Sequence, residues 1–227
     1  MLFEASRART KRAQAFIDEL RELYEAYARD DPLTVRLKTS PAGVDLVFDW
    51  KGTGLLPGVV VGDCIHSLRT SLDLMSSEMA RLNGHSDKNV HFPFADTLAE
   101  FEKAIKNKNF KKCGDDAVSL LNTLKPHRGG NEHLRALHDL DIQDKHQALI
   151  PTHSTMDFDF DKELVIDGPA VSAGLAVSDV VLTFPPNGPL DGLPLAETLE
   201  NLVHLVEGIL DSFETLVLGR PAKGVTP

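Results

Sequence analysis

The sequence has few of the features that would identify its class directly. It contains two cysteines, Cys64 and Cys113, without a C-x-x-C pair, which excludes disulfide scaffolds and cysteine-rich zinc modules. No apolar run approaches the roughly 20 residues that a membrane span requires, and the basic N-terminus lacks the apolar stretch of a signal peptide. We therefore expect a soluble, cytoplasmic protein with reduced, buried thiols and no membrane association.

Positive charge is also scarce. The 227 residues include 24 Lys and Arg against 34 Asp and Glu, which gives a formal charge of -10. A surface that binds phosphate must therefore be a local basic patch on a chain whose net negative charge repels phosphate. Specific DNA binding is not expected. The best local patch comprises Lys103, Lys106, Lys108, Lys111 and Lys112. This segment fits either a solvated helix edge or a nucleic-acid surface.

Amphipathic helices are the clearest feature that is present. In three long segments the apolar residues recur at alternating spacings of three and four, which predicts helices over 4–29, 59–83 and 195–218. Shorter helices are expected between 97 and 145, with a Thr97–Glu100 capping box and Asn131 as an N-cap. In the middle segment the stripe consists of Val61, Ile65, Leu68, Leu72, Met75, Met79 and Leu82.

The remaining segments have the period of two that is typical of strands. Residues 33–50 predict an antiparallel hairpin, and residues 148–184 predict three short strands separated by Pro, Gly and Ser. We therefore predict a single α+β domain over 1–227. A helical bundle from 1–30, 59–146 and 195–218 would carry an antiparallel sheet of about five strands packed on one side. Exposed residues on the long helices could also form a homodimer.

Polar residues follow the apolar stripe of the 59–83 helix. His66, Arg69 and Asp73 fall on one face beside the core, where partial burial would shift a pKa and require partners for charge. This arrangement suits an anion site or an acid–base pair. An intrahelical ion pair of Arg69 with Asp73, together with a core histidine, would also explain it.

Histidines concentrate between residues 127 and 146. The cluster lacks H-E-x-x-H and any His pair at i, i+4, so we predict neither a metal site nor a cofactor. Asp144, Lys145 and His146 end the predicted helix, where the two basic residues complement the helix dipole. The four histidines are His127, His133, His138 and His146.

These residues resemble a pattern found in a group of uncharacterised bacterial and phage proteins, H-[NS]-L-R-x-x-L-D, then F-P, then D-K-H. The matching segments are 66–73, 92–93 and 144–146; Lys125 and His127 replace the Gln and Tyr of a Q-P-Y element in that group. The resemblance implies no particular activity. It implies that the polar residues meet in one pocket between two helices. They are His66, Arg69, Asp73, Asp144, Lys145 and His146.

A more distant resemblance is to the HEPN superfamily of helical bundles, which includes dimeric, metal-independent ribonucleases with an Arg-x(4 to 6)-His motif. Arg128 and His133 have this spacing, although Gly129 and Gly130 lie between them. The resemblance implies that His133 would assist attack by a ribose 2′-hydroxyl and that Arg128 would stabilise the phosphate.

Two functional hypotheses follow from different classes. The first is a binding or interaction protein whose polar pocket is structural or holds a small anionic ligand or a nucleotide. The alternative is a HEPN-like ribonuclease or toxin component that acts on RNA through Arg128 and His133. A dimer that brings both pairs into one basic cleft would favour the alternative.

Overall fold

The computed structural model describes residues 2–30, 33–40, 43–146, 150, 153–156, 164–167, 170–173 and 180–220. This part of the chain is mostly helical and contains six α-helices. None of its helices is long and apolar enough to cross a membrane.

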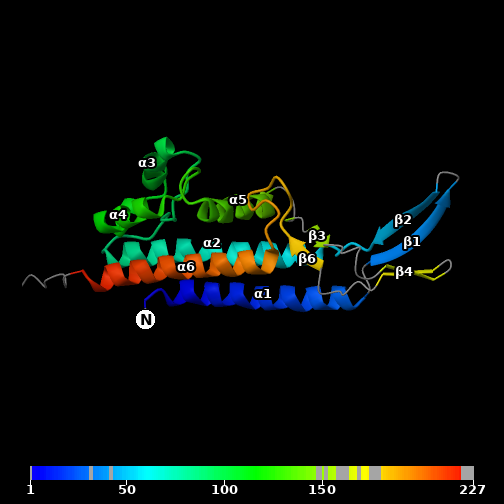
Figure 1. The fold of residues 1–227 in the computed structure, drawn as a ribbon. Helices are drawn as coiled ribbons and strands as arrows, with labels where there is room; N and C mark the ends of the chain where they lie inside the picture. Colours follow the sequence, from blue (N-terminus) through cyan, green and yellow to red (C-terminus); the bar gives the residue numbers. More distant parts are fainter. Residues whose placement is uncertain are drawn as a thin grey trace, which may run out of the picture.

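Three long helices form the base of the molecule. They are α1 (Glu4–Arg29), α2 (Leu56–Leu82) and α6 (Leu195–Leu218), and they run side by side (Figure 1). Their apolar stripes face one another, because burial of apolar surface drives such helices together. In α2, for example, Ile65, Leu68 and Leu72 have no exposed surface. The bounds predicted for α1 and α6 are confirmed, and α2 begins slightly earlier than predicted, with Pro57 in its first turn.

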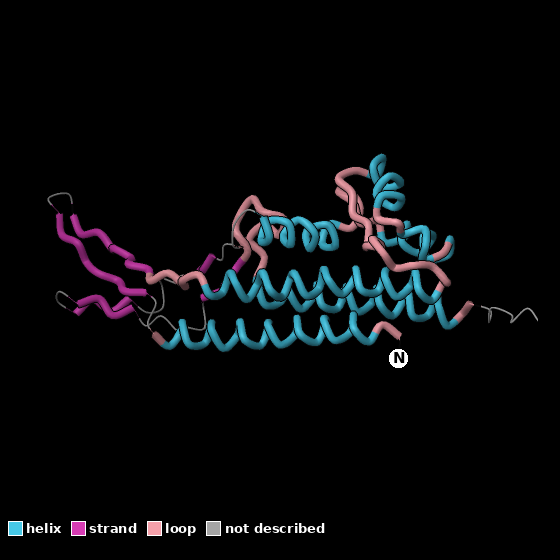
Figure 2. The backbone as a smooth tube through the Cα atoms, turned by 180° about the vertical axis from the view of Figure 1, so that it is seen from behind, coloured by secondary structure: helices cyan, strands magenta, loops and turns pink. Residues whose placement is uncertain are grey.

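Shorter helices cover α2 on the side away from α1 (Figure 2). They are α3 (Leu98–Asn107), the 3-10 helix η1 (Phe110–Cys113), α4 (Asp115–Leu124) and α5 (Glu132–His146). Both predicted caps are present. The Thr97 hydroxyl accepts a hydrogen bond from the Glu100 amide at 3.3 Å, and the Asn131 side chain accepts one from the Leu134 amide at 3.0 Å.

Each described strand pairs with only one other strand. β1 (Leu33–Ser40) and β2 (Gly43–Trp50) form the predicted antiparallel hairpin, with Leu33 opposite Trp50. β3 (His153–Met156) pairs with β6 (Val180–Thr183), and β4 (Leu164–Asp167) pairs with β5 (Ala170–Ala173). The other residues of the three strands predicted in 148–184 lie mainly outside the described part of the chain.

The predicted α+β architecture is therefore wrong. The fold is mostly helical, and among the described residues no five-stranded sheet packs on the bundle. One physical reason is that α3, α4 and α5 cover the side of α2 away from α1, so no sheet can pack there (Figure 2). The β1–β2 hairpin instead extends beyond the end of the bundle (Figure 1).

Both cysteines lie in the helical core, as predicted. Cys64 and Cys113 are free and buried, and the Cys64 thiol donates a long hydrogen bond to the Ala13 carbonyl at 3.6 Å. Burial raises the pKa of each thiol to about 12. A thiol with such a pKa stays protonated near neutral pH and is a poor nucleophile.

Candidate functional site

The candidate site lies where α5 crosses close to α2. A side chain at Gly62 would lie 2.3 Å from Oδ1 of Asp144, so glycine permits this close approach. The approach places the last turns of α5 over the first half of α2. Residues from the two polar segments of the sequence therefore meet across this contact.

Asp141 is the centre of the first polar group. Its carboxylate is buried, with 5 % of the residue exposed, and it contacts a donor on each oxygen. His66 Nδ1 lies 3.0 Å from Oδ1, and Lys145 Nζ donates to Oδ2 at 2.7 Å. The His66 and Lys145 side chains remain 44 % and 39 % exposed. The buried carboxylate thus fixes two accessible polar groups at the surface.

The orientation of His66 is fixed on both sides of its ring. While Nδ1 contacts Asp141, Nε2 lies 3.4 Å from the hydroxyl of Thr70, one turn further along α2. A carboxylate on one ring nitrogen is the usual means by which proteins hold an imidazole for hydrogen bonding or proton transfer.

Two further carboxylates make this site acidic. Burial raises the pKa of Asp144, and the nearby charges of Asp63 and Asp141 raise it further, while His66 and Lys145 oppose the shift. Three carboxylates therefore surround one lysine and one histidine. A bound anion would have to overcome this repulsion.

Arg69 is the centre of a second polar group, one turn along α2 from His66. Its guanidinium is buried and lies 2.7 Å from Asp73, and it also donates to the Phe92 carbonyl at 3.3 Å. Asp73 in turn accepts a hydrogen bond from the Phe92 amide at 2.8 Å. The arginine and aspartate thus anchor the Phe92–Pro93 segment to α2. This is the intrahelical ion pair that the sequence allowed, with an added role in holding a loop.

His138 packs against this arginine. Its ring stacks on Phe94 at 4.5 Å between centroids, and the Arg69 guanidinium lies 4.7 Å from the centroid of the same phenylalanine. Burial lowers the pKa of His138 to about 4, with further lowering from the charges of Arg69 and Arg135. His138 is therefore neutral near pH 7.

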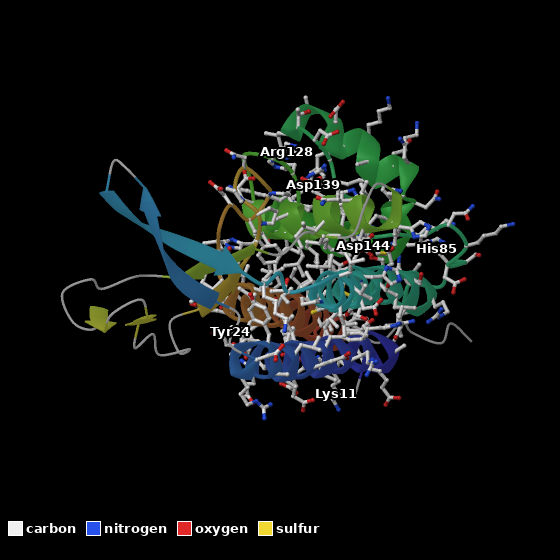
Figure 3. All side chains as sticks on the ribbon, turned by 90° about the vertical axis from the view of Figure 1, so that its right-hand side faces the viewer. Lys11, Tyr24, His85, Arg128, Asp139 and Asp144 are labelled. Atoms are coloured by element: carbon white, nitrogen blue, oxygen red, sulfur yellow. The ribbon has the colours of Figure 1, made fainter. Side chains whose placement is uncertain are left out.

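A third polar group contains Arg128 (Figure 3). Its guanidinium lies 2.9 Å from Asp139, which also pairs with the buried Arg135 at 2.5 Å. Asp96 contacts both arginines, at 2.8 Å from Arg135 and 3.7 Å from Arg128. The two arginines are therefore neutralised by two carboxylates, and the group ties α5 to the loop before α3.

His133 lies elsewhere on α5. It lines a cavity of about 250 Å³ together with Pro189, Leu190 and Leu193, whereas Arg128 reaches toward Asp139. Asp139 lies six positions after His133 on α5, which places the two residues about 120° apart around the helix axis. Arg128 and His133 thus have different surroundings.

The structure brings together only part of the predicted set. His66 and Lys145 meet at Asp141, and Asp144 lies beside them, whereas Arg69 and Asp73 form the neighbouring group. The side chain of His146 lies outside the described residues. Asp141, Asp139, Arg135 and His138 were not in the predicted set. The i, i+4 spacings of Asp141 with Lys145 and of Arg135 with Asp139 were the available signal.

Among the described residues, no group of three or more His, Cys, Asp or Glu side chains is arranged to hold a metal ion. Comparisons of the chain with models of known protein families, with curated proteins and with solved structures found no match.

Proposed function

We propose that the chain is a non-enzymatic interaction protein whose partner docks on the exposed face of α2 and α5 around His66. We call this face the α2–α5 surface. The observation that carries the proposal is the buried Asp141, which holds the half-exposed His66 and Lys145 side chains. A buried carboxylate is costly to desolvate, and here it positions two groups that solvent and a partner can both reach.

Apolar side chains continue the α2–α5 surface toward the start of α2. Leu55, Leu56 and Val59 are 75 %, 51 % and 38 % exposed. Along α2, positions 56, 59, 63 and 66 alternate in spacings of three and four, so they share one face of the helix. An exposed apolar stripe that borders fixed polar groups is typical of protein-interaction surfaces.

Charge selects the kind of partner. Asp63 is exposed and Asp144 is half-buried beside it, so the surface favours a basic side chain over an anion. The anionic ligand and the nucleotide that the sequence suggested have less support here. We infer a partner that presents apolar side chains to Leu56 and Val59 and a lysine or arginine to Asp63 and Asp144.

A synthetic amphipathic helix with a leucine face and a lysine face is a suitable probe. We expect fluorescence anisotropy to show binding that Leu56→Asp weakens by about tenfold or more, because an apolar contact is lost. Leu218→Asp is the matched control, since Leu218 is exposed at the other end of the helical bundle. Equal weakening by both variants, or equal binding of a glutamate version of the helix, would refute the proposal.

The ribonuclease alternative has less support. Arg128 is paired with Asp139, and His133 lines a cavity to which Arg128 does not contribute, so the two residues do not share a described site. Its test is cleavage of labelled single-stranded RNA in EDTA by the wild type, His133→Ala and His66→Ala. The interaction proposal predicts no cleavage by any of them. Cleavage that His133→Ala abolishes would establish the ribonuclease instead.

A further inference from the structure

A second charged surface lies at the opposite end of α2. Residues 103–113 carry five lysines and no acidic residue, in a chain whose formal charge is -10. The segment runs from α3 through η1. Lys103, Lys106, Lys108 and Lys111 are exposed, and among the described residues none of these four forms an ion pair. This contrasts with Arg69, Arg128, Arg135 and Lys145, which are all paired with carboxylates.

The fold adds the loop after α2 to this segment. The His91 amide donates to the Lys108 carbonyl at 3.1 Å, and Lys112 Nζ donates to the Lys88 carbonyl at 3.3 Å. The Asn109 side chain donates to the Asn89 carbonyl at 3.0 Å. Residues that are far apart in the sequence are thus tied into one surface. We call it the basic end, and it consists of His85, Lys88, His91, Lys103, Lys106, Lys108, Lys111 and Lys112.

Three of the acidic residues near the basic end are paired, whereas Glu102 and Asp115 are exposed beside it. Asp87, in the same loop, forms an ion pair with Arg81, and Asp116 pairs with Arg220. Asp73 is engaged by Arg69 and faces His91 at 3.6 Å. The field of the lysines is therefore opposed at this surface mainly by Glu102 and Asp115, and the lysines of the basic end outnumber these two carboxylates.

We propose that the basic end binds the sugar–phosphate backbone of a nucleic acid without reading its bases. Unpaired ammonium groups gathered at one end of α2 supply the counterion-releasing contacts on which non-specific nucleic-acid binding depends. The aromatic side chains here, Phe92, Phe101 and Phe110, are buried, so none is available to stack on bases.

A membrane surface fits this end less well than a nucleic acid. The apolar residues Phe101 and Ile105 of α3 face the core, whereas interfacial helices insert such residues into the bilayer. Leu98 is exposed, but it lies in the first turn of α3, at the opposite end of that helix from Lys106 and Lys108.

The test is fluorescence anisotropy with labelled RNA and DNA, each as a duplex and as a single strand, at 50 and 200 mM salt. If about four phosphates are contacted, affinity falls about a hundredfold over this range. Lys108→Glu with Lys111→Glu should remove most of the binding and lower the salt slope by about two. The matched control is Arg9→Glu with Lys11→Glu on α1, which makes the same change in net charge at exposed positions. Its affinity for nucleic acid should stay closer to that of the wild type.

Three outcomes would overturn the claim that the basic end binds nucleic acid. The first is no binding to any nucleic acid at 50 mM salt, and the second is an equal loss of nucleic-acid affinity in the two double variants. The third is stronger binding to vesicles that contain anionic lipid than to nucleic acid. Dependence on base sequence at constant salt would overturn the claim that the bases are not read. Thermal unfolding of both double variants shows whether each is folded, and the single variants Lys108→Gln and Lys111→Gln serve if charge reversal unfolds the chain.

Discussion

At the residue scale, the α5 side chains show how charge is accommodated beside the helical core. Asp141 and Arg135 are each buried, and each contacts two groups of opposite charge or a hydrogen-bond donor. Burial of an ionised group is tolerated only with such partners, because the loss of solvation otherwise exceeds the gain. His138 differs from them, since burial beside two arginines keeps it neutral.

His138 makes stability depend on pH. Its pKa of about 4 in the folded protein lies below the usual value, so the unfolded chain binds more protons between the two values. Its contribution is therefore complete above about pH 6.5 and is lost as the pH falls toward 4. From pH 7 to pH 5 we expect a loss of about 2 kcal/mol from this residue.

Urea unfolding of wild type and His138→Gln at pH 7 and pH 5 measures this loss. Glutamine cannot titrate, so the variant should lose about 2 kcal/mol less over this range than the wild type. An identical pH dependence in the two proteins would show that His138 titrates normally.

Part of the site could be predicted from the spacing of individual residues in the sequence. The spacing of His66, Arg69 and Asp73 placed them on one face, and the structure has them there, with Arg69 paired to Asp73. The partner of His66 could not be predicted, because that contact depends on how α5 crosses α2. Asp141 and Asp144 lie three residues apart, and only the close approach at Gly62 decides which of them meets His66.

At the element scale, the spacing of apolar residues predicted the bounds of the long helices well. The stripe of α2 predicts core residues without any knowledge of the partner helices, because helical residues three and four apart share a face. The strands were harder to place. The alternation in 33–50 identified a hairpin, but alternation does not state which strands pair or whether a helix already occupies the neighbouring face.

The packing of the apolar stripe of α2 can be tested directly by substitution. Leu72 is fully buried and Leu82, in the last turn, is 40 % exposed. Leu72→Ala should lower the free energy of unfolding by about 2–5 kcal/mol, because it removes packed atoms and leaves a cavity. Leu82→Ala should cost less than about 1 kcal/mol. Urea denaturation distinguishes them, and equal costs would contradict the assigned packing.

The β1–β2 hairpin should be dispensable for folding of the bundle. Its two ends are close together, since Asp30 forms an ion pair with Lys51 and the Tyr27 hydroxyl donates to the Lys51 carbonyl at 2.6 Å. A short glycine–serine linker in place of residues 33–50 should therefore leave the helical circular dichroism and its cooperative thermal transition largely intact. Loss of the transition would show that the hairpin stabilises the bundle.

At the scale of the whole molecule, charge is divided between the two ends of α2. The α2–α5 surface is acidic and lies around Asp63, and the basic end lies beyond Leu82. Along the helix these positions are about 28 Å apart at 1.5 Å per residue. The chain can therefore present surfaces of opposite charge to two different partners at once.

Charge exchange at Asp63 tests the proposed interaction most directly. Asp63→Lys should weaken binding of the leucine–lysine helix by about tenfold and strengthen binding of the matching leucine–glutamate helix, because one contact changes from attraction to repulsion. Asp18→Lys, on the exposed face of α1, alters the net charge equally and should change neither affinity much. If the two variants shift both affinities by the same amount, binding follows net charge alone, and the α2–α5 surface is not the docking site.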